Sequence, residues 1–479
     1  MRRNKLFTAV PVLALAIAAG ACDDGLADIN RNPNNPEDVP VETVLSSGIW
    51  DVVANAGGRG VFGEWTTLYH TSLWPQHVAQ SAYNDEDRYS PREGVNENIW
   101  EEMYAGALQD LQRTKELAQE SGDQNLLAVA EIMQVYGFLF LTDMFGDVPY
   151  FEALNLEEFP KPAFTPQAEI YTDLLTRLET AASQINPGAS ATFATGDLIY
   201  DGNLQQWVEF ANALRLRVAI RLANTELAET GRAAFAAAWA ADKFDDNSDN
   251  ADLDWAGTPP AQNPIYEQIV IGGRTGDFRV SATLVDTLKS LSDPRLPIFA
   301  DPAKTDGAYR GLQNGRTPAQ AGGTVDHFSW IGSYFIQPTT PSVLMSYSEM
   351  LFLGAEAAAL GWIADDPATL YRQGIEASMQ QYGVAQTEID AYLAQPKVAY
   401  NGLPSIGVQK WIALYLAGPE AFTEVRRTGY PQLQLAFANV TGAFPARLPY
   451  PADEGLYNAE NFAPYENVTF TDPVWFMQQ

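Results

Sequence analysis

Catalytic residues in recognisable patterns are absent from this sequence. It has three histidines, at positions 70, 77 and 327, and a single cysteine, Cys22. A zinc site needs three or four His, Cys or carboxylate ligands at close spacing, and neither HExxH nor paired cysteines occur. The nucleophile elbow GxSxG and the phosphate-binding loop GxxxxGK[ST] are missing as well. We therefore expect a protein that is not an enzyme and that holds no cofactor or metal ion.

Acidic side chains could still do chemistry. The run DDNSDNADLD at 245–254 gathers the oxygen ligands that Ca²⁺ prefers. An EF-hand loop beginning at Asp245 would need glycine at 250 and glutamate at 256, where this chain has Asn250 and Ala256. This spacing favours a solvated, turn-rich loop. A carboxylate pair for glycoside hydrolysis stays open, because there are 60 acidic residues and only the folded chain sets their separation.

Aromatic residues gather in two stretches that also carry amide side chains. Flat indole and phenol rings stack on the C–H faces of sugars, while nearby amides and carboxylates meet the hydroxyls; peptides can use the same surfaces. Any single ring is more often packed in a core, so the hypothesis concerns the group. The candidate ligand-binding residues are Trp74, Tyr83, Tyr89, Trp330 and Tyr334.

The charge of the chain limits its partners. Its 29 basic and 60 acidic side chains give a formal net charge of -31. The resulting field repels phosphate backbones and anionic lipid headgroups, which excludes a nucleic-acid partner. Neutral sugars and peptides are not repelled, and cations are enriched near the surface.

The first 21 residues have the pattern of a secretory signal. Arg2 and Arg3 precede an apolar stretch over 6–19, which is shorter than the roughly 20 residues of a membrane-spanning helix. Small residues then lead to Cys22, which has no partner for an intramolecular disulfide. This arrangement resembles the lipobox of bacterial lipoproteins; the alternative is a secreted protein with a spare thiol. We expect residues 1–21 to be a signal peptide and Cys22 to be lipidated.

The lipid is the only membrane contact that we expect. Several acyl chains on one cysteine anchor a protein stably, since each buried methylene contributes about 0.8 kcal/mol. No later segment is expected to be hydrophobic enough to cross a membrane. Residues 22–42 contain two Asn-Pro pairs and form a turn-rich tether. Asp23 and Asp24 resemble the surface-export signal of lipoproteins in Bacteroidetes-like bacteria, which predicts an outer-membrane protein that faces the cell exterior.

Helical periodicity dominates the rest of the chain. Apolar residues recur at three- and four-residue spacing over 97–118, and 124–145 is apolar almost all round, which predicts a central buried helix. Further helices are expected at 167–185, 207–222, 231–242, 347–358, 366–382 and 406–417. Long irregular stretches rich in aromatic residues separate the helices, at 55–95, 245–280, 292–342 and 430–479. The expected fold is an all-α scaffold that carries ordered loops, an arrangement suited to ligand binding.

Seven blocks, in order along the chain, resemble the SusD/RagB family of nutrient-binding lipoproteins. They are DINRNPNNP (28–36), LTDMFGDVPYFEA (141–153), WVEFANALRLRVAIRL (207–222), SDPRLP (292–297), SYSEMLFLGAEAAALGW (346–362), WIALYLAGPEAFTEVRRTGYPQL (411–433) and RLPYPADEGLYNAENF (447–462). The resemblance implies a SusD-like domain over 43–479, built from four tetratricopeptide-like helix pairs with long loops.

The same resemblance implies a function and a partner. It predicts a lid on a SusC-like TonB-dependent transporter, which traps an oligosaccharide or a peptide between lid and barrel. It brings no catalytic residue, and because binding residues vary within the family, none is carried over to this chain. Two alternatives stay open: a surface glycoside hydrolase on a helical scaffold, and a tetratricopeptide adaptor that binds no small ligand.

Overall fold

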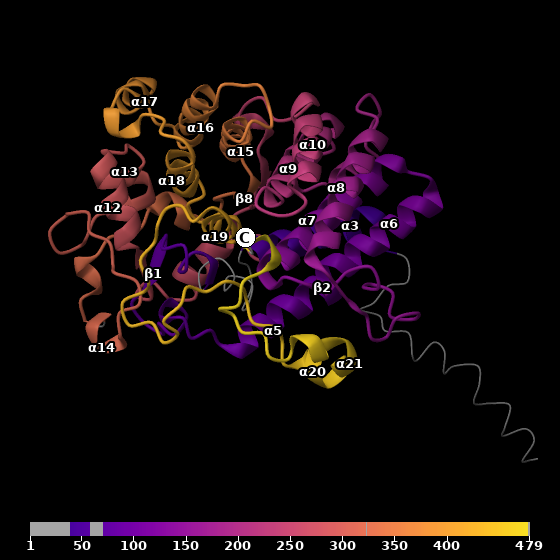
Figure 1. Ribbon diagram of the computed structural model, residues 1–479, viewed down its shortest axis with the longest axis horizontal. Helices are drawn as coiled ribbons and strands as arrows, with labels where there is room; N and C mark the ends of the chain where they lie inside the picture. Colours follow the sequence, from indigo (N-terminus) through magenta and orange to yellow (C-terminus); the bar gives the residue numbers. More distant parts are fainter. Residues whose placement is uncertain (1–38, 58–69, 322, 478–479) are drawn as a thin grey trace, which may run out of the picture.

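The computed structural model describes residues 39–57, 70–321 and 323–477 (Figure 1). The predicted signal peptide 1–21, Cys22 and most of the predicted tether lie outside these residues, so the lipid anchor stays a prediction. The domain expected from residue 43 begins inside a helix, because α3 spans Val41–Gly57.

Helices make up most of the described chain, as the sequence predicts. The longer ones after α3 are α5 (Glu93–Glu101), α6 (Leu108–Ser121), α7 (Gln124–Phe145), α8 (Gln167–Gln184), α9 (Leu204–Arg221), α10 (Ala228–Ala240), α12 (Ala282–Leu291), α15 (Tyr347–Ala359), α16 (Pro367–Gln381), α17 (Gln386–Leu393), α18 (Leu403–Ala413) and α19 (Gly418–Thr428). The short ones are α11 (Pro264–Tyr266), α13 (Leu296–Phe299), α14 (Pro318–Ala321), α20 (Asp453–Tyr457) and α21 (Ala459–Phe462). A π-helical segment, η3 (Glu102–Ala107), joins α5 to α6. The expected all-α class is confirmed, whereas α3, α12, α17 and α19 were not predicted as helices.

The central helix α7 follows from a sharp local break. Gly122 adopts a left-handed backbone with φ of 73° and ends α6, a conformation that costs glycine little. The side chain of Asp123 then accepts hydrogen bonds from the backbone N–H groups of Asn125 and Leu126, which caps the start of α7.

Helix α7 is long and apolar enough to cross a membrane by length and composition alone. Its most apolar window has a mean hydropathy of 1.5, and 78% of that window is buried inside the protein. This corrects the expectation that no later segment reaches this threshold. The burial confirms the prediction of a core helix, because neighbouring helices cover its apolar surface.

Consecutive helices pack against each other in pairs. Contacts join α6 to α7, α7 to α8, α8 to α9 and α9 to α10, and α15 packs on both α9 and α16. Figure 1 shows α6 to α10 along one side of the molecule, with α15, α16 and α18 beside them. The opposite side carries α12, α13, α14 and β1, where most of the chain is loop. The arrangement is that of stacked helix pairs supporting a loop-rich region.

Short antiparallel strands connect the loops to one another through backbone hydrogen bonds. The strands are β1 (Val78–Gln80), β2 (Val148–Pro149), β3 (Phe164–Thr165), β4 (Ala251–Leu253), β5 (Phe278–Val280), β6 (Ala300–Asp301), β7 (Trp330–Ile331) and β8 (Ser342–Met345). They form four two-stranded pairs: β1 with β5, β2 with β3, β4 with β8 and β6 with β7. Segments far apart in sequence are thereby held in register.

A network of buried charges connects five helices: α7, α9, α15, α18 and α19. Arg217 and Arg221 project from α9, and their partners come from α7, α15 and α19. The network consists of Asp143, Arg217, Arg221, Glu349, Glu356, Lys410, Glu420, Glu424 and Arg427. This explains why the blocks at 207–222 and 411–433 are rich in arginine and glutamate although their helices are buried. Each charge is tolerated because an opposite charge lies beside it.

Candidate ligand-binding site

A cavity of about 440 Å³ lies between the helical scaffold and the loop region. Its helical side is formed by Tyr136 of α7, Glu349 of α15 and Glu420 of α19. The other side is formed by the loop around η5 (Asn247–Asp249), by β4 and β8, by η8 (Ser333–Ile336) and by the end of α16. A volume of this size is in the usual range for small-molecule sites, which lie preferentially in clefts of this kind.

Aromatic rings form one wall of the cavity. Tyr334 is 41% exposed, and its ring centroid lies 5.6 Å from that of Tyr382 in an edge-on arrangement. Phe335 packs edge-on against Tyr415 at 5.0 Å, which fixes the base of this wall. All four residues line the cavity, together with Tyr136. Rings with one face open and the other packed are suited to stacking on a ligand.

The loop that carries Tyr334 is held by close backbone contacts. A Cβ atom on Gly332 would lie 1.9 Å from the backbone oxygen of Ile298, so only glycine fits at the start of η8. At the other end, the hydroxyl of Thr340 donates to the backbone oxygen of Tyr334 at 2.6 Å. The amide of Asn263, which also lines the cavity, donates to the backbone oxygen of Thr340 at 2.8 Å. These contacts hold the backbone on both sides of Tyr334 and so position its ring, although the only regular structure here is the four-residue 3-10 helix η8.

Strand alternation directs a carboxylate toward the cavity. Ala251 and Leu253 of β4 are buried in the core, so Asp252 between them faces the opposite side of the strand and lines the cavity. Across the ladder, Asp252 is paired with Val343 of β8. The pairing fixes the direction of the Asp252 side chain.

Four buried polar atoms of residues in the cavity wall have no hydrogen-bond partner among the described residues. They are Oδ1 of Asp252, Oδ1 of Asn247, the hydroxyl of Tyr415 and Oε1 of Glu420. Buried polar atoms are nearly always paired in native proteins, so each such atom calls for an explanation. Burial, with a smaller contribution from Asp254, raises the pKa of Asp252 to about 7. Unpaired polar atoms on residues that line one cavity are typical of a site that binds a polar ligand.

The other two carboxylates in the wall are already neutralised. Arg217 binds Glu349 through both Nε and Nη2, each at 2.7 Å, and Arg221 forms an ion pair with Glu420. No lysine, arginine or histidine lines the cavity in the part of the chain that the structure describes. Asp252 is therefore the one acidic residue of this wall without a cationic partner among the described residues.

The raised pKa of Asp252 gives a prediction about stability. Because its folded pKa of about 7 exceeds the ordinary 3.8, the folded state binds more protons between pH 4 and 7, and stability falls as the pH rises through that window. Asp252→Asn should therefore raise the free energy of unfolding by about 2–4 kcal/mol at pH 8 and change it little at pH 4. Nearby Tyr200, Tyr334 and Tyr382 stay neutral throughout. Urea unfolding at pH 4, 6 and 8 measures this.

The control for that experiment is Asp286→Asn. Asp286 is exposed on α12, outside the cavity, and the substitution removes the same charge. Its pH profile should follow that of the wild type. Parallel profiles for wild type and Asp252→Asn would contradict the assignment of a buried, unpaired carboxylate.

Two of the five aromatic candidates are core residues. Trp74 is 0% exposed; its Nε1 donates to the backbone oxygen of Glu86 at 3.0 Å, and its ring packs edge-on against Phe422. Tyr89 is 1% exposed, and its hydroxyl accepts a hydrogen bond from the backbone N–H of Ala436 at 3.0 Å. A ring without exposed surface has no face for a ligand, so packing replaces the predicted binding role of both.

The remaining three candidates lie at separate places. Tyr334 lines the cavity. Tyr83 is 65% exposed, does not line the cavity, and lies beside the Arg274 guanidinium. Trp330 is half-buried, with the guanidinium carbon of Arg279 and the Nζ of Lys304 each 3.8 Å from its ring centroid, so cations already occupy its π surface. The structure thus does not bring the five residues together as one binding surface.

Several residues of the cavity were not among the sequence candidates. They are Tyr136, Asn247, Asn250, Asp252, Asn263, Gln380, Tyr382 and Tyr415. Asp252 had a usable signal, because Ala-Asp-Leu alternates as a strand does, but it lies inside the acidic run 245–254. The tyrosines belong to helices or their ends, where sequence alone predicts core packing.

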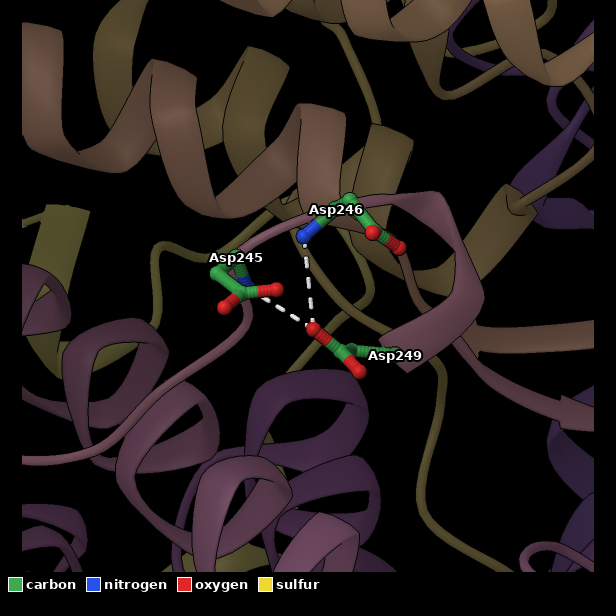
Figure 2. A group of neighbouring side chains, drawn as sticks. All are labelled: Asp245, Asp246 and Asp249. Carbon is green, nitrogen blue, oxygen red and sulfur yellow. Dashed lines mark hydrogen bonds between the residues drawn. The ribbon is translucent and has the colours of Figure 1, made fainter.

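Three aspartates of the acidic run form a compact group at the edge of this region. Figure 2 shows Asp245, Asp246 and Asp249. Each contributes one carboxylate oxygen, and these three oxygens lie within 4.8 Å of one another. Oδ2 of Asp249 accepts the backbone N–H groups of Asp245 and Asp246, at 2.8 and 3.3 Å, and Oδ1 of Asp246 accepts that of Ser248 at 2.6 Å. These bonds close the loop, and they account for the grouping without a metal ion.

Comparison with known proteins agrees with this architecture. The family model SusD-like_2, described as "Starch-binding associating with outer membrane", matches residues 33–451. A solved "chitin-binding protein" is similar at 29% identity and a TM-score of 0.80, over 90% of this chain and 100% of that one. A chitin-binding SusD homologue from Flavobacterium johnsoniae shows 25% identity and a TM-score of 0.81, over 90% and 98% of the two chains.

A further solved structure extends the likeness of the fold. A SusD homologue from Bacteroides uniformis shows 23% identity and a TM-score of 0.82, over 91% of this chain and 99% of that one. No curated protein matches the chain. Because the family model covers most of the sequence and the solved homologues cover nearly all of the fold, the chain belongs to the SusD-like family.

Proposed function

We propose that this protein is a surface lipoprotein that captures an oligosaccharide in the tyrosine-lined cavity and delivers it to a SusC-like TonB-dependent transporter. The observation that carries the proposal is the cavity itself. It combines the exposed ring of Tyr334 with an amide oxygen, Oδ1 of Asn247, and a carboxylate oxygen, Oδ1 of Asp252, that have no partner among the described residues. Rings that stack on sugar faces and polar groups that meet sugar hydroxyls are the two elements of glycan recognition.

The relatives support a carbohydrate ligand over a peptide. The family description names starch, and two of the three solved structures described above are chitin-binding proteins. Both of these ligands are chains of pyranose rings, whose hydroxyls are donors as well as acceptors. Donors on the ligand are what Oδ1 of Asn247 and of Asp252 require.

Delivery and location rest on the family and on the N-terminus. The family description places its members in association with the outer membrane. Lipidation of Cys22, an orientation toward the cell exterior and a SusC-like partner complete the proposal. Purification of the tagged full-length protein from outer membranes should co-purify a large barrel protein and should show acyl chains on Cys22. A soluble, unmodified protein without such a partner would contradict this part.

The chemistry of the cavity favours binding over hydrolysis. A typical glycosidase uses two carboxyl groups, one as general acid and one as nucleophile or base. Glu349 and Glu420 are held in ion pairs by Arg217 and Arg221, which leaves Asp252 alone among the described cavity residues. Incubation with chitin or starch oligomers should therefore release no new reducing ends.

Replacement of Tyr334 tests the site directly. Tyr334→Ala should weaken binding of an N-acetylglucosamine hexamer about tenfold or more, because it removes a stacking face at a cost of about 1.4 kcal/mol or more. Isothermal titration of the full-length protein in detergent measures the affinity. Tyr83→Ala is the matched control, since Tyr83 is exposed outside the cavity. Wild-type affinity in Tyr334→Ala, or a loss confined to Tyr83→Ala, would move the site elsewhere.

A further inference from the structure

Resting on the proposed glycan-binding function, we infer that the cavity selects a sugar unit with a free, protonated amine, and that Asp252 is the group that binds this amine. The inference goes beyond starch and chitin, whose units are a neutral sugar and an N-acetylated amino sugar. It is carried by the hydrogen-bonding capacity of the wall, by its charge and by its aromatic rings.

The wall needs hydrogen-bond donors. When Asp252 is ionised, its Oδ1 is an acceptor only, as is Oδ1 of Asn247, and both atoms are buried without a partner among the described residues. A protonated primary amine supplies three N–H donors from one atom, whereas a hydroxyl supplies one and an N-acetyl group supplies one and adds an acceptor. The amine therefore satisfies the acceptors of this wall best.

The charge of the wall is negative and lacks a counterion. Glu349 and Glu420 have arginine partners, but Asp252 has none in the described chain, and Asp254 follows it on the same segment. A buried carboxylate without a cation is costly, and a cationic group on the ligand removes that cost. A neutral sugar leaves the charge uncompensated, and a uronic acid adds a second negative charge.

The rings of the wall suit a cation as well. Tyr334 and Tyr382 lie 5.6 Å apart and edge-on, and each is close enough to the Asp252 carboxylate for that charge to act on its hydroxyl. Aromatic faces attract ammonium groups, most strongly where water is excluded. The same rings therefore offer a stacking face for the sugar and a favourable environment for its amine.

The experiment compares ligands of equal length on the full-length protein in detergent. Isothermal titration at pH 7 and 0.15 M salt uses tetramers of glucosamine, N-acetylglucosamine and galacturonic acid, and a tetrapeptide with one lysine. The glucosamine tetramer should bind the wild type at least tenfold more tightly than the N-acetylated one, and galacturonate should bind weakest. In Asp252→Asn the two amino-sugar tetramers should bind within about threefold of each other.

Asp286→Asn controls for the general attraction of a cation to an acidic protein. It removes one exposed aspartate outside the cavity, so the ratio between the two tetramers should stay as in the wild type. Folding is checked by the unfolding midpoint, which Asp252→Asn should not lower.

The outcomes separate this inference from the proposed function. Equal affinities for the two amino-sugar tetramers, or a preference that survives Asp252→Asn, overturn the inference and leave glycan binding in place. Tighter binding of the tetrapeptide than of any sugar tetramer also overturns it. If none of the sugar tetramers binds, the proposed function itself fails.

Discussion

Replacement of Glu424 by glutamine should destabilise the protein by about 3–5 kcal/mol. Glu424 is buried on α19, accepts hydrogen bonds from Arg221 at 2.5 Å and from Arg427 at 2.7 Å, and forms an ion pair with Lys410 at 2.9 Å. Burial alone would raise its pKa, but Arg427, Lys410 and Arg221 outweigh burial and hold the pKa well below its usual value. Glutamine leaves those buried cations with one anion fewer. Urea unfolding at pH 7 measures the loss.

A matched substitution of an exposed glutamate shows how much of the loss in stability is due to burial of the ion pair. Glu229 also bonds an arginine, Arg232, at 2.7 Å, but both side chains are exposed on α10. Solvent screens such pairs, so Glu229→Gln should leave the unfolding midpoint unchanged. Equal losses for the two variants would mean that the network does not tie the helices together.

Removal of the Trp74 side chain should cost about 3–5 kcal/mol of stability. Its ring is fully buried between α19 and the C-terminal segment, edge-on to Phe422 and stacked near Phe470 at 6.4 Å. Trp74→Ala leaves a large cavity and removes one of the two hydrogen bonds that the backbone oxygen of Glu86 accepts, the other coming from the backbone N–H of Tyr89. The affinity of the folded fraction for a glycan should not change, because Trp74 does not line the cavity.

The comparison for Trp74 is Tyr83→Ala. That ring is 65% exposed, so its loss should leave stability near that of the wild type. A Trp74→Ala protein that keeps its stability but loses its ligand would restore Trp74 as a binding residue and contradict its assignment to the core.

The helices that were predicted from the sequence are those whose apolar residues follow the core. Helix α7 was placed at its observed bounds, because its apolar residues and the break at Gly122 and Asp123 agree. Helix α19 was missed for the opposite reason. Its buried face carries charges such as Glu424 and Arg427, and a pattern that equates burial with apolar residues cannot recognise a face of paired charges.

The candidate site was predicted only in part, because its residues meet through long-range contacts. Tyr334 was found from its loop, but the wall around it comes from α7, β4, α16 and the segment before α19. The burial of Trp74 depends on Phe422 and Phe470, which lie more than 340 residues away in sequence. Local composition marks a ring as a candidate, whereas its exposure is decided by segments of this kind.

The family could be predicted from sequence motifs, whereas the cavity could not. Ordered motifs such as FGDVP and RRTGYP were sufficient for the SusD-like fold, which the family model and the solved homologues confirm. They coincide with the buried network and with turns, so they report on the scaffold. The loops that carry Asp252 and Tyr334 lie outside the seven blocks, and their role follows from the structure.

A crystal structure of the protein with a bound amino-sugar oligomer tests the central claim most directly. The account predicts a sugar ring against Tyr334 and Tyr382, with a polar group of the ligand within hydrogen-bond distance of Asp252. An oligomer bound at Tyr83 or Trp330, with nothing between β4 and the end of α16, would contradict it.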